Sequence, residues 1–470
     1  MSLTLKEAIL SEFPHTPTQE QAEGIDRLCH FCTTPVDHKA FILKGYAGTG
    51  KTSVIAALIR AMRKFGHGTV LLAPTGRAAK VLAGYSHHSA YSIHKEIYRQ
   101  KSSAEAVFGL NYNSRKNTLF IIDEASMINN SDNGGAFFGS GRLLDDLIEY
   151  IYSGDNCQAI FIGDTAQLLP LGQTHSPALE ASVLAGYGLE THEYTLREVL
   201  RQEIDSGILY NATLLRKHIT EDNGRIPAFD LSYSDIRRVG GEDLIDAINA
   251  AYREAGSENC IVLTYSNKRS TLYNRGIRNQ VLYKEEEIAN GDYILITKNN
   301  YYWSQPYENL DFIANGEIAE IIRIGRHTEM YGFRFADVTM RLTDYDMEID
   351  ARLLLDSLYT DNQQSVNALN QRLLETVAED YADVTNKRKF WEEMRKNGYY
   401  NALQVKFAYA ITCHKAQGGQ WEHVFVDQGY LTEENVDRGY LQWLYTAFTR
   451  ATGKLYLVNF SDFFFNDTKR

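Results

Sequence analysis

A glycine-rich segment near the N-terminus constrains this chain more than any other feature. Residues 45–52 read GYAGTGKT, which fits the pattern G-x-x-x-x-G-K-[ST]. An apolar run at 39–45 precedes the segment, and a run with helical spacing at 53–65 follows it. Glycines at such a strand-to-helix turn let backbone N–H groups close around phosphates, and the helix N-terminus adds partial positive charge. The segment therefore predicts a nucleoside triphosphate site, with ATP and Mg²⁺ as the expected cofactors.

Individual residues of this loop have distinct expected roles. Lys51 is expected to reach the β- and γ-phosphates, and the Thr52 hydroxyl is expected to bind Mg²⁺. The rest of the phosphate cradle is expected from Gly45, Gly48, Thr49 and Gly50.

Acidic and amide side chains stand at the ends of two later apolar runs. Asp123 and Glu124 end the run at 119–125. We expect Asp123 to hold Mg²⁺ and Glu124 to polarise the attacking water as general base. Gln167 follows the run at 158–164, and its amide can both donate to the γ-phosphate and accept from the water.

Two arginines are candidates for a cation on the transferring phosphoryl group. Arg201 lies in LREVLRQ and Arg450 lies in YTAFTRA. A planar guanidinium suits the charge that develops in phosphoryl transfer. Either arginine taken alone is more often part of a surface ion pair, so its role depends on the wider pattern.

The first half of the chain alternates continuous apolar runs with helical spacing. Continuous apolar strands joined by helices indicate a parallel sheet covered on both faces. Ligands of such sheets bind beyond the carboxyl ends of the strands, which is where the polar residues stand. The expected strands are 39–45, 69–75, 119–125 and 158–164.

The second half begins and ends in the same way but is interrupted. A strand is expected at 260–267, and further strands at 404–412, 423–427 and 454–460. Between them, residues 291–343 alternate with period two and turn at Asn290-Gly291 and Asn315-Gly316. Residues 350–398 are charged and helical in pattern. A β-rich module is therefore expected inside a second α/β domain.

Composition bounds the class of protein. A length of 470 residues suggests two to four domains. The net charge of −12 argues against an evenly basic nucleic-acid binder but allows a local basic groove. No signal peptide or membrane span is recognisable, so a soluble, cytoplasmic protein without a membrane partner is expected. Cys29 and Cys32, two of five cysteines, are expected to be buried thiols rather than zinc ligands.

The motifs, taken in order, resemble one family. The P-loop, DEAS, GDTAQLLP, LRQ, TCHKAQGGQ and YTAFTR segments are similar to those of superfamily-one helicases, in the RecD/Dda-like branch that moves 5′→3′ on single-stranded DNA. The resemblance implies an α/β fold of two RecA-like domains with parallel sheets, the second carrying an SH3-like insertion. The implied ranges are 1–195 for the first domain with a pin at about 95–118, 196–282 and 401–470 for the second, and 283–400 for the insertion.

The resemblance also implies roles for residues whose chemistry alone does not indicate a role. Gln21 matches the glutamine that reads adenine, and Arg201 and Arg450 match the two γ-phosphate arginines. Single-stranded DNA and its junctions with duplex are the implied partners. The implied DNA contacts are Pro74, Thr75, Gly76, Arg77, Ser92, His94, Thr264, Ser266, Asn267, Thr412, His414 and Lys415.

The chain departs from the family pattern in two places. Gln420 stands where the family often has a ribose-contacting glutamate, and the strand pattern of the pin region is weak. The expected function is an ATP-dependent DNA helicase. The alternatives are a translocase or regulatory DNA clamp without strong unwinding, an RNA helicase of the same superfamily, and a P-loop ATPase that acts on something other than nucleic acid.

Overall fold

The computed structural model describes nearly the whole chain. The described residues are 4–102, 105–131, 138–170, 172–199, 205–222, 224–307, 310, 312–360 and 362–465. Arg201 lies outside these ranges. Within them, no helix is long and apolar enough to cross a membrane. All five cysteines are free thiols, and the described residues contain no group of three or more His, Cys, Asp or Glu side chains arranged to hold a metal ion by themselves.

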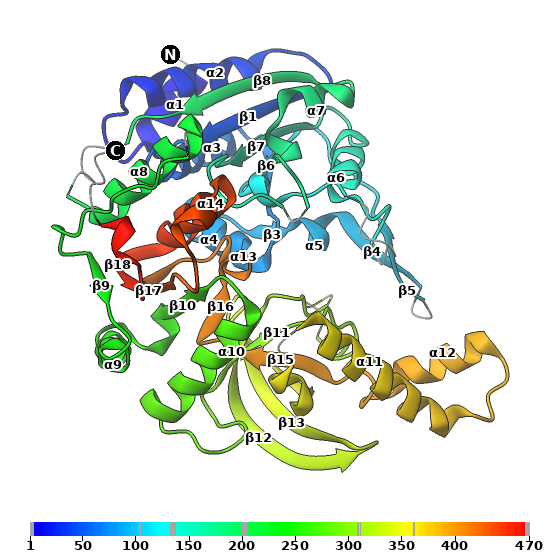
Figure 1. Cartoon of the computed structure of the whole chain (residues 1–470). Helices are drawn as coiled ribbons and strands as arrows, with labels where there is room; N and C mark the ends of the chain where they lie inside the picture. Colours follow the sequence, from blue (N-terminus) through cyan, green and yellow to red (C-terminus); the bar gives the residue numbers. More distant parts are fainter. Residues whose placement is uncertain are drawn as a thin grey trace.

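The first domain is built on a six-stranded sheet in which every strand pair is parallel (Figure 1). The strand order is β3-β2-β6-β7-β1-β8. The strands are β1 (Lys39–Gly45), β2 (Gly68–Ala73), β3 (Ala90–Ser92), β6 (Thr118–Ile122), β7 (Gln158–Gly163) and β8 (Glu190–Leu196). The four strands expected from the apolar runs are confirmed as β1, β2, β6 and β7.

Helices cover both faces of this sheet, as the continuous apolar strands require. Along β1, Ala40 and Ile42 join one apolar cluster while Phe41 and Leu43 join the other, because successive strand residues point to opposite faces. The helices are α1 (Leu5–Glu12), α2 (Gln19–Thr33), α3 (Lys51–Lys64), α4 (Gly76–Ser86), α5 (Ile93–Ile97), α6 (Leu143–Tyr152) and α7 (Ala181–Gly186).

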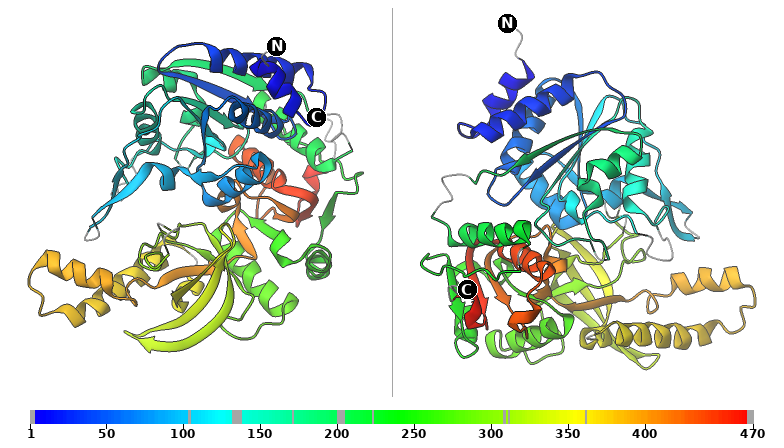
Figure 2. Two further views of the ribbon diagram at one scale, coloured as in Figure 1. Left: turned by 180° about the vertical axis from the view of Figure 1, so that it is seen from behind. Right: turned by 45° about the horizontal axis from the view of Figure 1, so that its top comes forward.

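A hairpin extends from the first domain where the sequence pattern is weak. Strands β4 (Tyr98–Ser102) and β5 (Glu105–Leu110) pair antiparallel. It points to the same side of the molecule as the helical arm described below (Figures 1 and 2). The region at about 95–118, where a pin is expected, therefore contains an antiparallel hairpin.

The second domain contains a five-stranded parallel sheet in the order β16-β10-β17-β18-β9. Its strands are β9 (Ile236–Val239), β10 (Cys260–Thr264), β16 (Ala410–Thr412), β17 (Trp421–Asp427) and β18 (Ala451–Val458). Its helices are α8 (Gly207–Glu221), α9 (Leu244–Ala255), α10 (Asn267–Gly276) with a π-helical continuation at Ile277–Val281, α13 (Cys413–Ala416) and α14 (Arg438–Phe448).

A closed five-stranded barrel interrupts this domain. Its strands are β11 (Tyr293–Ile296), β12 (Ile318–Met330), β13 (Phe333–Leu342), β14 (Met347–Leu354) and β15 (Leu403–Phe407). Gly291 and Gly316 have φ of 72° and 97°, so the expected Asn-Gly turns are confirmed. Barrel and second sheet share one apolar core, which fixes the barrel to its host domain. Helices α11 (Gln363–Ala378) and α12 (Lys387–Lys396) form an arm that projects from the barrel (Figure 2).

The expectation of one strand at 404–412 was wrong. This run is two strands, because β15 closes the barrel while β16 joins the parallel sheet. Asn274 satisfies the backbone at the break: its amide donates to the carbonyls of Phe407 and Ala410 and accepts from the Ala410 N–H. Both halves are buried, so hydrophobicity alone does not mark the change of partner.

Candidate functional site: a nucleotide cleft and a strand groove

The P-loop has the geometry that phosphate binding needs. Gly48 and Gly50 adopt φ of 73° and 78°, the left-handed region that favours glycine. A side chain at Gly45 would come within 2.8 Å of the Lys51 side chain, so this position must stay small. The Lys51 ammonium donates to the carbonyl oxygens of Gly45 and Tyr46 at 2.7 and 2.8 Å. The backbone of the P-loop thus holds the Lys51 ammonium at the expected phosphate site.

Three carboxylates meet the P-loop at the carboxyl ends of β6 and β7. These are Asp123, Glu124 and Asp164, and together with Lys51 and Thr52 they line a cleft of about 650 Å³. This volume lies in the ordinary range for small-molecule sites. Because β6, β7 and β1 are neighbours in the sheet, their ends converge on one place.

Glu124 is held in an unusual state. Its backbone φ is 49°, a left-handed conformation that costs a non-glycine residue on the order of 1–2 kcal/mol. Burial raises the pKa of its carboxyl, although Arg450 partly opposes this. A raised pKa brings a carboxylate closer to the range in which it accepts a proton well at neutral pH. The surrounding structure therefore maintains both the strain and the basicity of Glu124.

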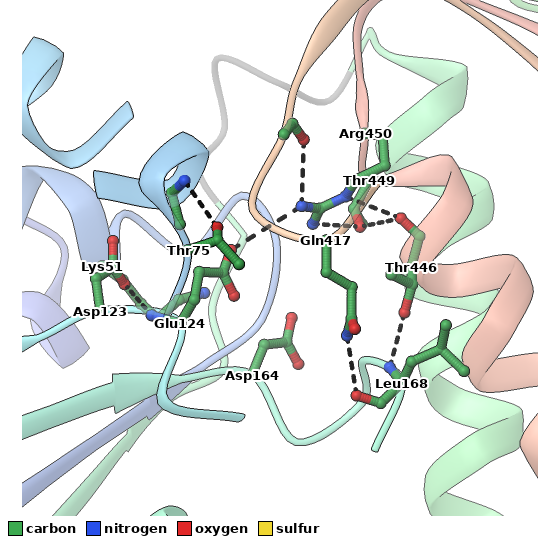
Figure 3. Close-up of polar contacts among 12 residues, drawn as sticks. Lys51, Thr75, Asp123, Glu124, Asp164, Leu168, Gln417, Thr446, Thr449 and Arg450 are labelled. Atoms are coloured by element: carbon green, nitrogen blue, oxygen red, sulfur yellow. Dashed lines mark hydrogen bonds and ion pairs between the residues drawn. The ribbon is translucent and has the colours of Figure 1, made fainter. Parts of the chain in front are cut away.

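Arg450 enters the cleft from the second domain. Its guanidinium lies 4.0 Å from the Glu124 carboxylate and donates to the backbone carbonyls of Thr446 and Gly419 (Figure 3). The side chain is buried. The structure thus brings Arg450 to the cleft, as the sequence predicted, whereas Arg201 lies outside the described residues and its role stays a prediction.

Tyr445, which sequence analysis did not single out, connects the two domains at this site. Its hydroxyl donates to Asp164 at 2.6 Å and accepts from the Ala47 N–H of the P-loop at 2.9 Å. Burial, with Asp164 beside it, keeps the pKa of Tyr445 well above its usual value, so the hydroxyl stays a donor. Its only sequence signal is its place in the YTAFTR segment, five residues before Arg450.

The loop that carries Gln167 is also bonded to the second domain. The Leu168 N–H donates to the Thr446 hydroxyl at 2.8 Å, and Gln417 donates to the Leu168 carbonyl at 3.1 Å (Figure 3). Gln167 lines the cleft, and its buried amide oxygen has no hydrogen-bond partner among the residues that the structure describes. A buried acceptor without a partner is costly unless a ligand satisfies it.

The residues present fit a nucleotide with Mg²⁺. The Thr52 hydroxyl and the Asp123 carboxylate are oxygen ligands of the kind that Mg²⁺ prefers. Gln167, whose amide oxygen is buried, also lines the same cleft. Gln420 also lines the cleft, whereas Gln21 is fully buried and bonds to the backbone of Thr18 and Thr49.

A second concave site, here called the strand groove, lies between the two domains and the barrel. The barrel wall includes Phe312, Glu317, Asp344 and Tyr345, none of which the sequence singled out. Eight of the residues expected to contact DNA line it together: Pro74, Thr75, Gly76, Arg77, Ser92, His94, His414 and Lys415.

The other four expected DNA residues do not line the strand groove. Thr264 is fully buried and its hydroxyl donates to the Ser266 carbonyl, so its side chain does not offer the expected DNA contact in this structure. The Ser266 hydroxyl accepts from Arg269 N–H and caps α10, whose first residue, Asn267, is exposed. Thr412 is almost completely buried. Residues buried in β10 and β16 support the loops that follow them.

The groove contains unusual titrating groups. Burial lowers the pKa of His94 to about 4, so this imidazole is neutral at pH 7. Burial, with Lys406 nearby, lowers the pKa of Lys415 to about 8. Burial, with Asp344 nearby, raises the pKa of Glu317 to about 8. One Glu317 oxygen accepts from the Tyr345 hydroxyl at 3.2 Å, and the other has no hydrogen-bond partner within the described part of the chain.

Aromatic rings tie the hairpin to the barrel beside this groove. Phe108 of β5 packs against Tyr301 with ring centroids 4.8 Å apart, and against Phe138 at 5.1 Å. Phe138 in turn contacts Phe312 at 5.6 Å and His94 at 5.0 Å. The hairpin base is therefore packed against both the groove and the barrel.

Comparisons with known proteins agree with this layout. Residues 18–229 match a family model described as an AAA domain, and residues 407–458 match one described as a UvrD-like helicase C-terminal domain. An uncharacterised protein of Acanthamoeba polyphaga mimivirus is 24% identical, covering 89% of this chain and 95% of its own. An ATP-dependent RecD2 DNA helicase of Deinococcus radiodurans is 22% identical over 93% of this chain. The chain spans 48% of that relative's length.

Solved structures with a remote overall likeness include two Pif1 helicases. The Bacteroides protein in complex with ADP-AlF3 and single-stranded DNA has a TM-score of 0.48 and 14% identity, covering 96% of this chain and 95% of that one. The Candida albicans protein has a TM-score of 0.43 and 16% identity, covering 97% of each chain.

Arg450→Ala should lower ATP turnover on the order of 10³-fold, because the guanidinium that faces Glu124 across the cleft is lost. Affinity for nucleotide should change much less, since the P-loop stays intact. Steady-state turnover and the binding of a fluorescent nucleotide measure the two effects. A variant that keeps half of the wild-type turnover would show that Arg450 only supports the backbone of its own domain.

Affinity for single-stranded DNA should fall by roughly tenfold between pH 7 and pH 9, about the effect of 1.4 kcal/mol. Over this interval Lys415, with its pKa of about 8, loses positive charge, and Glu317, with its pKa of about 8, gains negative charge. Both changes repel phosphate. Fluorescence anisotropy at constant ionic strength measures the affinity, and Glu317→Gln should flatten part of the curve. A wild-type affinity that is constant over this range would contradict the assignment.

Proposed function

We propose that this chain, an ATP-hydrolysing helicase of the superfamily-one RecD/Pif1-like kind, moves 5′→3′ along single-stranded DNA and separates duplex DNA. One observation carries the proposal: the nucleotide cleft and the strand groove lie at the same junction between the two domains. A change in how the domains sit on one another would therefore alter both sites at once.

Each residue of the cleft has a separate proposed role in phosphoryl transfer. Lys51 and the P-loop N–H groups are placed to hold the β- and γ-phosphates, and Arg450 to stabilise charge that develops in the transition state. Glu124 is placed to accept a proton from the attacking water, which Gln167 would orient. When held by Thr52 and Asp123, Mg²⁺ neutralises charge on the phosphate oxygens.

The groove supplies contacts that suit a strand of any sequence. Pro74, Thr75, Gly76 and Arg77 come from the first domain, and His414 and Lys415 from the second. Hydroxyls, backbone groups and cations of this kind bind phosphates without reading bases. A stepping motor needs strand contacts on two separate domains, because one domain can stay bound to the strand while the other moves.

Gln417 links the two sites directly. It lines the strand groove, and its amide donates to the Leu168 carbonyl, beside the Gln167 of the cleft. A strand that displaces the loop around Gln417 would therefore act on the group that orients water. This contact supports strand-stimulated hydrolysis over an ATPase that acts on something other than nucleic acid.

The hairpin and the barrel support unwinding over simple translocation. We assign β4–β5 as the pin that splits duplex, and the barrel, with its arm, as the SH3-like insertion of the family. The aromatic packing of Phe108 on Phe138 and Tyr301 gives the hairpin a rigid base against the barrel. A wedge must be held firmly if the motor is to pull duplex against it.

ATP turnover should rise on the order of tenfold or more with single-stranded DNA, and less with single-stranded RNA of the same sequence. The three conditions are DNA, RNA and no polymer, measured side by side at low salt because phosphate contacts weaken steeply with salt. Lys51→Ala should abolish nearly all turnover under each condition, because it removes the cation at the phosphates. Stimulation by RNA alone would favour an RNA helicase, and stimulation by neither would overturn the proposal.

Duplex with a 5′ single-stranded tail should be unwound, and duplex with a 3′ tail should not. The two substrates are identical except for tail polarity, and a trap captures the released strand. Unwinding of the 3′-tailed substrate alone would overturn the direction but leave the motor intact. Unwinding of neither, with normal DNA-stimulated turnover, would favour a translocase and would contradict the assignment of β4–β5 as a pin.

A further inference from the structure

Tyr85 joins the nucleotide cleft from a helix that begins in the strand groove. Its hydroxyl donates to one carboxylate oxygen of Asp123, while the other oxygen accepts from the Glu124 N–H at 2.9 Å. The orientation of the Asp123 carboxylate is therefore set by two donors, one of them on α4.

The other end of the same helix forms part of the strand groove. Thr75 caps α4 by accepting from the Ala78 N–H at 3.1 Å, and Thr75, Gly76 and Arg77 line the groove. Tyr85 lies in the last turn of this helix, which has 11 residues. At 1.5 Å per residue the helix is about 16 Å long. One short helix thus has one end in each site.

The groove end of α4 is also packed against both parts of the second domain. The Arg77 guanidinium lies 4.1 Å from the centre of the Trp421 ring. The Lys80 ammonium donates to the Thr343 carbonyl of the barrel. A methyl group added at Gly418 would lie 2.7 Å from the Ala78 Cβ. Such close packing leaves little room for the second domain or a strand to shift without moving α4.

We propose that Tyr85 is a positioning residue that transmits occupancy of the strand groove, through α4, to the carboxylate of Asp123. This inference rests on the proposed function, because it assumes a strand in the groove and a metal ligand in Asp123. The strand contacts Thr75 to Arg77 and reorients α4. The Tyr85 hydroxyl then reorients the carboxylate toward the geometry that the metal needs.

Tyr85→Phe tests this directly, since it removes the hydroxyl and keeps the ring. The readout is binding of Mn²⁺ to the protein–ADP complex, measured by electron paramagnetic resonance with and without oligo(dT). In the wild type, oligo(dT) should raise Mn²⁺ affinity roughly fivefold, a typical coupling between two sites. In Tyr85→Phe this response should disappear while affinity for oligo(dT) without nucleotide is unchanged. Raising Mg²⁺ should restore much of the lost DNA-stimulated turnover.

Tyr187→Phe is the matched control. The Tyr187 hydroxyl also donates to an aspartate of the first domain, Asp145, but neither residue lines the cleft or the groove. This variant should keep the full response to oligo(dT). Lys80→Ala provides a second test from the other end of α4, because it removes the bond to Thr343 without touching the cleft. It should weaken the response.

Several outcomes would overturn the inference. These are a full response in Tyr85→Phe, no response in the wild type, and equal losses in Tyr85→Phe and Tyr187→Phe. If Tyr85→Phe does not fold, a full response in Lys80→Ala overturns it. A wild-type protein that fails to bind oligo(dT) at all would overturn the proposed function and this inference together. A wild type that binds and responds while Tyr85→Phe also responds would overturn only the role of Tyr85.

Discussion

Hydrogen bonds between α14 and the first domain hold the nucleotide cleft together. Neither domain carries the complete set of proposed catalytic groups, because Lys51 and Glu124 belong to the first domain and Arg450 to the second. The Tyr445 hydroxyl touches both the P-loop and Asp164, and Thr446 accepts from Leu168. In a buried, low-dielectric site each of these bonds is stronger than in water, and each is costly to leave unmade. The cleft is therefore specified by contacts that exist only when the domains are close.

Much of the fold follows from the sequence, and the reason is physical. Strands β1, β2, β6 and β7 are buried on both faces, so they stand out as continuous apolar runs. Polar residues at their carboxyl ends then cluster because parallel neighbours end at one edge. The run at 404–412 could not be divided in this way. The barrel strand β15 and the sheet strand β16 are equally apolar, so the sequence does not show where one ends and the other begins. The hairpin β4–β5 was hard to foresee because β4 reads YRQKS, which is polar and lacks the apolar run that marks the strands of the sheet.

The residues of the candidate site were predictable only where a sequence motif lies at the end of a predicted strand. Lys51, Asp123, Glu124 and Gln167 follow from strand ends, and the structure places all four in one cleft. Tyr85, Tyr445 and Glu317 had no such signal. Each acts through a partner far away in sequence, such as Asp164, which lies 281 residues from Tyr445. The role of a single tyrosine or glutamate can be recognised only when the tertiary structure shows which residue it contacts. The depressed pKa of Lys415 likewise depends on burial that a sequence does not show.

Under the proposed function, the titrating groups of the groove explain how a protein with a net negative charge would bind an anionic strand. A net charge of −12 would repel DNA if it were spread evenly, but binding depends on the field where the strand lies. Here burial disfavours the charged forms of three groups: it lowers the pKa of Lys415 and raises those of Glu317 and Asp344. A groove without phosphate thus lets its acids approach neutrality, so Glu317 offers a hydroxyl donor where a carboxylate would repel. A phosphate entering beside Lys415 stabilises the ammonium and, by the same field, the protonated form of Glu317. Under the proposed function, a strand would therefore strengthen the charge pattern that binds it, and the groove would not need a large fixed positive charge to hold DNA.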